Sequence, residues 1–166
     1  LCSMNQISHL QSKILSFSTL EFQLKKWRSA NEKIVFTNGC FDLLHFGHVD
    51  YLAKARDLGN RLVVGLNTDA SIRRLKGSSR PVKDEQSRLW LLAGMAFVDA
   101  VVLFDEKTPI NLISMISPDV LVKGGDYKIK DIVGHEIVLN NNGKVFAIDY
   151  VDGYSSSALI EKIKTS

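Results

Sequence analysis

Short apolar segments alternate with amphipathic segments along this chain of 166 residues. The short segments are rich in β-branched residues and are bounded by turn residues, a pattern typical of strands that are buried on both faces. Five such strands are predicted, at residues 33–37, 61–66, 100–104, 120–123 and 144–151. Because helical periodicity occupies the intervals between them, the pattern predicts a parallel sheet covered on both faces by helices.

The amphipathic segments predict helices at residues 18–28, 45–58, 84–96, 108–116 and 155–164. Ser18 and Glu21 have the spacing of a capping box, and Gly59 supplies a stop for the second helix. Residues 71–83 include Gly77 and Pro81 and are predicted to be mostly loop. We therefore expect one α/β domain of the Rossmann-like class, with a five-stranded sheet, at residues 18–166. Residues 1–17 are expected to be an extension that is partly disordered or forms an interface.

Composition is ordinary for a globular protein, with 45% hydrophobic and 23% charged residues, but the charge is unevenly placed. Between Arg73 and Arg88, six basic residues face only Asp84 and Glu85, so this segment has a net charge of +4 whereas the whole chain has +3. The segment is short and has no aromatic residue. A small polyanion such as a nucleotide therefore suits it better than nucleic acid. Arg73 and Arg74 are expected to be surface residues.

The two cysteines and the N-terminal segment bear on the cellular compartment. Cys2 and Cys40 lie in very different contexts, which makes a structural disulfide an unfavourable interpretation and fits a reducing environment. The N-terminal segment lacks the basic start and apolar block of a secretory signal. No stretch approaches the roughly 18 apolar residues that a membrane span needs. The expectation is a cytoplasmic protein that does not bind membranes.

The segment FTNGCFDLLHFGHVDYL, residues 36–52, holds the strongest candidate chemistry. The first predicted strand ends at Thr37, and ligands of such sheets bind at the carboxyl ends of the strands. Gly39 allows close approach of the backbone to a phosphate, and the following helix would present free N–H groups to an anion. His45 and His48 lie one helical turn apart and share a face, so both could donate hydrogen bonds to one phosphate chain.

The two histidines have other interpretations. Either one alone is explained well by packing of His48 and exposure of His45. A zinc site would use Cys40, His45 and His48, but it lacks a fourth ligand at a familiar spacing, so no metal site is predicted. The dinucleotide-binding and P-loop patterns are both absent.

The motif GCFDLLHFGH closely resembles the H-x-G-H signature of the nucleotidyltransferase superfamily, whose fold is cytidylyltransferase-like. The segments NTDASIRRLKGSSRPV, LVKGGDY and DGYSSSALIEKI are similar to those of the heptose 1-phosphate adenylyltransferases of lipopolysaccharide precursor synthesis. The likeness covers residues 32–163 with its motifs in the same order. These enzymes occur alone or as half of a bifunctional kinase–adenylyltransferase, and the present sequence, which lacks the kinase half, is expected to be the stand-alone form.

The resemblance implies that ATP and D-glycero-D-manno-heptose 1-phosphate are joined to give ADP-heptose and pyrophosphate. It implies that Mg²⁺ accompanies ATP. His45 and His48 would hold the α- and β-phosphates as catalytic residues. Lys76 and Arg80 would close over the triphosphate and the leaving pyrophosphate. Catalysis of this kind rests on positioning and charge neutralisation, which matches a sequence with many donors and no obvious nucleophile–base pair.

A further set of residues is implied to bind the nucleotide: Asn38, Gly39, Phe41, Asp42, Gly47, Lys123, Gly125, Asp126, Ser155, Ser156 and Ser157. Several have plainer explanations. Asp42 could orient the turn, hold a magnesium-bound water or cap the next helix, and the serines could simply cap the last helix. Superfamily members often have Ser-Ser-Thr where this chain has three serines. Ile160 stands where cytidylyltransferases often have arginine, and this difference weakens the alternative that the protein is a cytidylyltransferase.

Three rival functions remain open. The first is transfer of a nucleotidyl group to another acceptor, such as glycerol 3-phosphate, or from CTP. The second is a non-catalytic nucleotide-binding module, which the intact set of His45, His48, Lys76 and Arg80 argues against. The third is a nucleic-acid-binding protein, whose binding would fall steeply with salt. Because superfamily relatives are often dimers or larger, a homo-oligomer is expected.

Overall fold

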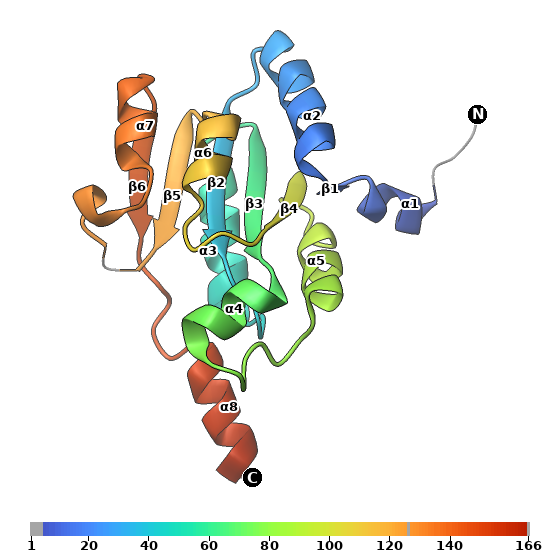
Figure 1. The fold of residues 1–166 in the computed structure, drawn as a ribbon, viewed down its shortest axis with the longest axis vertical. Coiled ribbons are helices and arrows are strands. Elements are labelled where there is room, and N and C mark those ends of the chain that lie inside the picture. The colour runs from blue at the N-terminus through green and yellow to red at the C-terminus, as the bar shows by residue number, and fades with distance from the viewer. Residues whose placement is uncertain (1–4, 126, 166) are drawn as a thin grey trace.

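A computed structural model describes residues 5–125 and 127–165 of the chain. Its strands are β1 (Ile14–Leu15), β2 (Ile34–Gly39), β3 (Arg61–Asn67), β4 (Ala100–Phe104), β5 (Val120–Gly124) and β6 (Lys144–Ile148). Its helices are α1 (Gln6–Gln11), α2 (Phe17–Ser29), α3 (Phe46–Arg56), α4 (Asp69–Lys76), α5 (Glu85–Ala93), α6 (Ile110–Ile116), the 3₁₀ helix η1 (Ile129–Asp131), α7 (His135–Asn140) and α8 (Ser156–Thr165). Figure 1 shows their arrangement.

The sheet is parallel and has six strands in the order β1-β4-β3-β2-β5-β6 (Figure 1). The α/β class and the parallel sheet are confirmed, but the predicted number of five strands is wrong. The additional strand is β1, in which Ile14 and Leu15 pair with Val101 and Val102 of β4. A segment of two residues is too short to show the alternation of a strand, so only its pairing with β4 defines this element.

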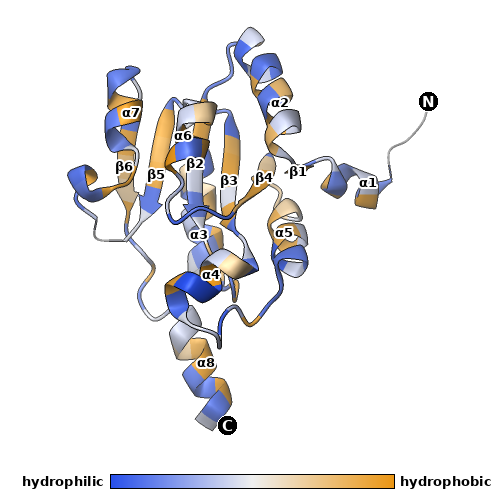
Figure 2. Ribbon diagram, viewed as in Figure 1, coloured by the Kyte–Doolittle hydropathy of each residue, from blue (hydrophilic) through white to orange (hydrophobic). Residues whose placement is uncertain are grey.

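Each face of the sheet is covered by its own set of helices. On one face, α2, α6 and α7 pack on buried side chains that include Phe36 and Leu121. On the other face, α3 and α5 pack on residues that include Val35 and Val122. Successive residues in the middle of the central strands thus point to opposite cores, which is why these strands are apolar over consecutive positions. Figure 2 shows the contrast between apolar β5 and strongly hydrophilic α4.

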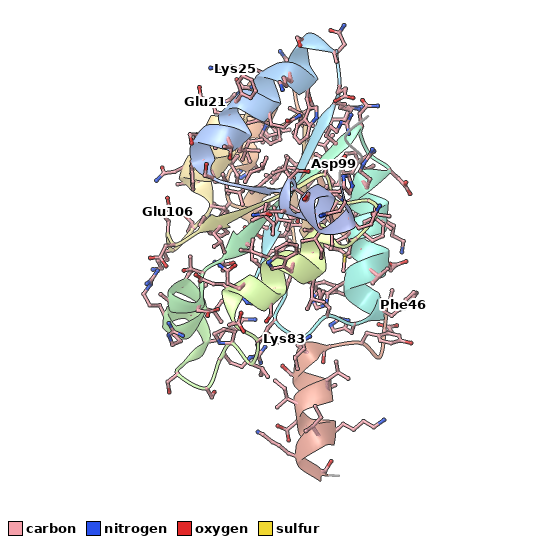
Figure 3. The ribbon with its side chains drawn as sticks, turned by 90° about the vertical axis from the view of Figure 1, so that its right-hand side faces the viewer. Glu21, Lys25, Phe46, Lys83, Asp99 and Glu106 are labelled. Carbon is pink, nitrogen blue, oxygen red and sulfur yellow. The ribbon has the colours of Figure 1, made fainter. Side chains whose placement is uncertain are left out.

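The predicted capping box is wrong, and the predicted loop at 71–83 is only partly right. The capping box of α2 uses Ser16 and Thr19, whose side chains bond each other's backbone N–H groups, and not Ser18 and Glu21. Glu21 instead pairs with Lys25 on the exposed side of the helix, at 3.0 Å (Figure 3).

The predicted loop at 71–83 begins with helix α4, which is capped by the side chain of Thr68 and ends at Gly77. Its arginines and lysine are good helix formers that suit the negative end of the helix dipole.

The two ends of the chain extend the domain in different ways. Residues 14–15 join the sheet, so part of the predicted extension belongs to the same layer; the boundary at residue 18 stays a prediction. Helix α8 projects beyond the carboxyl edge of the sheet and contributes no buried residue (Figures 1 and 3). Within the described ranges, no helix combines the length and hydropathy needed to cross a membrane.

Candidate active site

A cavity of about 530 Å³ lies at the carboxyl edge of the sheet. The edge opens where β2 is flanked by β3 on one side and β5 on the other, because the chain reverses its direction of winding there. Such switch points are the usual ligand sites of parallel α/β sheets. The predicted site residues that line the cavity are Asn38, Gly39, Phe41, Asp42, His48, Lys76, Arg80, Lys123 and Ser156.

The remaining predicted residues lie outside this lining. His45 and Gly47 are at the start of α3, directly behind His48. Gly125 follows β5, and Ser155 and Ser157 flank Ser156 at the start of α8. Asp126 lies outside the described residues.

The rings of His45 and His48 lie against each other, tilted, at the N-terminal end of α3. His45 is the N-cap residue, and the two ring centroids are 3.9 Å apart with 36° between the ring planes. The Nδ1 atoms of both rings are buried and have no hydrogen-bond partner among the described residues. Unsatisfied buried polar atoms are rare in native proteins, and each one calls for an explanation such as a catalytic role. The histidine pair therefore has the character of a binding site and not of ordinary packing.

Gly47 makes this arrangement of the rings possible. A Cβ atom at this position would lie 3.1 Å from ring atoms of His45 and 3.3 Å from the Cβ of Tyr154. Tyr154, in turn, lies parallel to the His45 ring, with the ring centroids 6.3 Å apart. The glycine of the H-x-G-H motif therefore leaves room for the first histidine to lie against the second.

Burial disfavours the charged form of both imidazoles. Burial lowers the pKa of His48 to about 4, and positive charge on His45 and Lys76 acts in the same direction. Burial likewise lowers the pKa of His45. A bound polyanion would oppose each of these effects by supplying negative charge. The electrostatics of the pair are therefore unfavourable for an additional cation and favourable for phosphate.

Asp42 fixes the loop between α4 and α5 against the site. Its carboxylate is almost fully buried and accepts hydrogen bonds from Arg80 Nε at 2.7 Å and from the backbone N–H groups of Val82 and Lys83. Burial alone would raise the pKa of Asp42, but these donors lower it overall. Of the three roles considered for Asp42, orientation of a loop fits this geometry, whereas the cap position of α3 belongs to His45.

Of the three lysines that line the cavity, two come from regular elements and the third is Lys107. Lys76 is the last residue of α4. Lys123 is the last but one residue of β5, and its Nζ lies 3.4 Å from the backbone oxygen of Asn38. Burial lowers the pKa of Lys123, and the charge of Lys76 lowers it further. Since Lys76 also acts on His48, the three groups lie within electrostatic reach of one another.

Gly124 and Gly125, at the end of β5, leave room for the aromatic ring of Tyr150. A Cβ atom at Gly124 would lie 2.7 Å from the ring of Tyr150, and one at Gly125 would lie 2.9 Å from it. Strand β6 ends at Ile148, three residues earlier than predicted, and this lets Tyr150 fold back over the glycines. Tyr150 remains 57% exposed and lines the cavity.

The three serines at positions 155–157 have different surroundings. Ser155 Oγ accepts a hydrogen bond from the backbone N–H of Ala158 and so caps α8. Ser156 Oγ donates to the backbone oxygen of Leu43 and lines the cavity, whereas Ser157 is exposed. This contact ties the start of α8 to the turn that precedes α3.

Arg88, which sequence reasoning missed, supports the site from behind its lining. Its side chain is fully buried and donates to the backbone oxygens of Cys40, Asn67 and Lys83 and to Asp69 Oδ1. It thus joins the ends of β2 and β3, helix α4 and the loop before α5. An arginine in an amphipathic helix is expected to be exposed, so the sequence indicated only that Arg88 adds to the positive charge of residues 73–88.

Within residues 5–125 and 127–165, no three His, Cys, Asp or Glu side chains are grouped so as to hold a metal ion. Cys40 Sγ lies 3.9 Å from Asn67 Oδ1. The zinc interpretation of Cys40, His45 and His48 therefore has no support in the geometry.

Residues 36–162 match the family model described as Cytidylyltransferase-like. The chain belongs to this family. The match begins in β2 and ends in α8, so it contains every element that carries the site.

Curated relatives are similar over nearly the whole chain. Bifunctional protein HldE of Citrifermentans bemidjiense is 55% identical over 155 residues, which are 93% of this chain and 32% of that protein. HldE of Campylobacter concisus is 52% identical over 157 residues, which are 95% of this chain and 32% of that protein. The chain thus spans about a third of the length of these relatives.

A solved structure shares the fold. The crystal structure of the lipopolysaccharide core biosynthesis protein from Thermoplasma volcanium is similar with a TM-score of 0.58 and 27% sequence identity. The similarity covers 75% of this chain and 99% of that one. The architecture predicted from the strand pattern is therefore shared with a protein whose structure has been solved by crystallography.

Proposed function

We propose that the protein is an adenylyltransferase that joins ATP and D-glycero-D-manno-heptose 1-phosphate, giving ADP-heptose and pyrophosphate for lipopolysaccharide precursor synthesis. Membership of the cytidylyltransferase-like family supports the reaction class. The likeness of LVKGGDY and DGYSSSALIEKI to the heptose 1-phosphate adenylyltransferases supports the substrates. The structural similarity to a lipopolysaccharide core biosynthesis protein supports the pathway.

The observation that carries the proposal is the convergence of His48, Lys76, Arg80 and Lys123 on one cavity. These donors come from α3, α4, the loop after α4, and β5. A cavity that concentrates cationic and imidazole donors at the switch point of the sheet suits a triphosphate and a sugar phosphate together.

The reaction requires little chemistry from the protein. An oxygen of the acceptor phosphate attacks the α-phosphorus of ATP, the bond from that phosphorus to the bridging oxygen breaks, and pyrophosphate leaves with the electron pair. His45 and His48 would stabilise the charge that grows on the bridging oxygen. Lys76 and Arg80 would hold the departing phosphates. Positioning and charge neutralisation of this kind account for most of the rate enhancement in phosphoryl transfers.

Mg²⁺ would enter with ATP as part of that substrate. Asp42 would not ligate the ion directly, because both of its carboxylate oxygens accept hydrogen bonds from the loop between α4 and α5. The triphosphate would then supply most of the metal's oxygen ligands, as is usual for Mg²⁺ at nucleotide sites. We further propose that the enzyme works in the cytoplasm, where ATP is made, as a homo-oligomer.

The test is pyrophosphate release by the purified protein with Mg²⁺, comparing ATP with CTP in the presence and absence of D-glycero-D-manno-heptose 1-phosphate. Release that requires both ATP and the heptose phosphate, with ADP-heptose identified by mass, is expected. Release of pyrophosphate with CTP or with glycerol 3-phosphate would overturn the proposed substrates but would still agree with the proposed phosphate-binding site. ATP binding without release for any pair would favour a binding module.

A further inference from the structure

The cavity spans the edge of the sheet from one face to the other. His48 and Tyr51 reach it from α3, which packs with α5 on one face. Residues 107–109 and 131–133 reach it from the connections into α6 and α7, which lie on the opposite face. Figure 1 shows the β4–α6 connection passing in front of the sheet and α3 behind it. The histidine wall and this second wall therefore offer separate places for two substrates.

The second wall has a different polarity from the phosphate-binding side. It presents the hydroxyl of Thr108 and the carboxylate of Asp131. Neither side chain makes a hydrogen bond or ion pair with any other part of the chain that the structure describes. Asp42, the other described carboxylate of the lining, is by contrast fully engaged by the loop before α5. Asp131 is exposed to solvent and is thus a free acceptor on the lining of a cavity otherwise rich in cations.

A free carboxylate excludes some parts of the substrates from its vicinity. It repels phosphate groups, because like charges at short range are unfavourable. It therefore suits the part of a ligand that has hydrogen-bond donors and no charge. The hydroxyl groups of a sugar have this character. The nucleobase has a better surface elsewhere in the cavity, because the half-exposed ring of Tyr150 over the Gly124–Gly125 backbone offers a face for stacking.

The positions of the lysines agree with this division. Lys123 lies at the end of β5, next to β2, between the two walls. Lys107 adjoins Thr108 on the second wall itself. A sugar 1-phosphate lying along this wall would have its phosphate near these cations and its hydroxyl groups toward Asp131. Its phosphate would then face the α-phosphate held at the histidines, as the transfer requires.

We propose that Thr108 and Asp131 form the subsite that binds the hydroxyl groups of the acceptor sugar and so select a polyhydroxylated sugar 1-phosphate. This inference rests on the proposed adenylyltransferase function and adds the residues that determine its acceptor.

Steady-state kinetics of Asp131→Asn and Thr108→Val test the proposal, with each substrate varied in turn. Both variants keep the size of the side chain but alter its hydrogen-bonding capacity. We expect the KM for the heptose 1-phosphate to rise about tenfold in Asp131→Asn and several-fold in Thr108→Val, as for the loss of one hydrogen bond. The KM for ATP should stay within about twofold of the wild-type value.

Glu106→Gln is the matched control. Glu106 lies on the β4–α6 connection, as Thr108 does. Its side chain is exposed and points away from the body of the protein (Figure 3), and it is not part of the cavity lining. It undergoes the same loss of one negative charge, so a general electrostatic effect would appear in both variants. Melting temperatures of the three variants should match that of the wild type. Thr108 and Asp131 have no side-chain partners within the described residues to lose, and a glutamine can still accept the hydrogen bond that Glu106 takes from the Asp105 N–H.

Deoxy analogues of the acceptor sharpen the assignment. Removing the hydroxyl group that Asp131 binds should weaken the wild type but have little further effect in Asp131→Asn, which is the signature of direct coupling. If Asp131→Asn and Thr108→Val raise only the KM for ATP, or change neither KM, the assignment of this subsite is wrong. Failure of the wild type to use any sugar 1-phosphate while it binds ATP would instead refute the adenylyltransferase function on which the subsite rests.

Discussion

Asp42 and Arg80 form a 2.7 Å ion pair in which the carboxylate is almost fully buried. The two residues are 38 positions apart in the chain. The pair therefore couples the turn after β2 to the loop that carries a predicted pyrophosphate ligand. This coupling holds the loop between α4 and α5 in place against the turn after β2.

Replacing Asp42 with asparagine should release that loop. The amide would place N–H groups against the backbone donors of Val82 and Lys83, and the Arg80 charge would lose its partner. Breaking a buried pair in this way costs on the order of 3 kcal/mol. We expect lower stability in denaturant, faster proteolytic cleavage near residues 80–83 and a KM for ATP raised about tenfold. Asp57→Asn, at an exposed position, is the control and should change none of these.

Replacing His48 with alanine should abolish most of the turnover. A preorganised donor to the transition state typically contributes a factor of about 100 to 1,000 in kcat. The fold should survive, since the side chain makes no hydrogen bond within the described chain. Circular dichroism and kcat measured on the same preparation check both statements. His9→Ala, on exposed α1, should leave kcat unchanged; equal loss in both variants would contradict the role of His48.

The stability of the free protein should fall as the pH is lowered through the range of His48. The unfolded chain takes up a proton on this imidazole near pH 6.5, whereas the folded protein does so only near pH 4. Between these values the unfolded state binds more protons, so the free energy of unfolding decreases with falling pH. Thermal melts from pH 7 to 4.5 should show a smaller decrease for His48→Gln than for the wild type. Saturating ATP should reduce the difference, because its phosphates raise the pKa of His48 again. A parallel decrease in both proteins would refute the assignment.

Replacing Lys76 with alanine should harm catalysis and leave the fold intact. The side chain is exposed at the end of α4 and has no hydrogen bond or ion pair within the described residues. We expect kcat/KM for ATP to fall at least tenfold, with a change in melting temperature below about 2 °C. Arg73→Ala, an exposed basic residue of the same helix, provides the comparison. A variant that mainly melts at lower temperature would show that Lys76 is structural.

Replacing Arg88 with methionine should damage stability and activity together. The substitution preserves much of the apolar stem but leaves three backbone oxygens and Asp69 without their donor. A cost of about 3–5 kcal/mol is expected for the loss of a buried charged partner. Arg88→Lys should recover only part of it, because lysine lacks the forked geometry. Arg73→Met should cost less than about 0.5 kcal/mol. Unfolding in urea measures all three.

The main strands and helices were predictable because each carries a local signal. The apolar strands at 100–104 and 61–66 stand out by composition, and the helix at residue 85 begins after an Asp84 cap. By contrast, β1 consists of two residues that form a strand only because β4 offers them an edge. Helix α4 was missed because the glycine, serines and proline that follow it dominated the interpretation of the segment.

The candidate site was predictable where a motif fixes the residues and not where the fold brings them together. His48, Lys76 and Lys123 follow from the motifs, and they converge on the cavity. The role of Asp42 as a loop anchor depends on donors about 40 positions away. Arg88 gave no local signal, because an arginine is expected to be exposed unless its partners are known.

The pairing of β1 with β4 has a practical consequence for shortened forms of the protein. A chain beginning at residue 18 would lose Ile14 and Leu15 and leave the backbone N–H and C=O groups of β4 open along one side. Open edges of this kind recruit strands from neighbouring molecules and promote aggregation. Residues 14 and 15 thus cover this part of the β4 edge, and shortened forms of the protein should retain them.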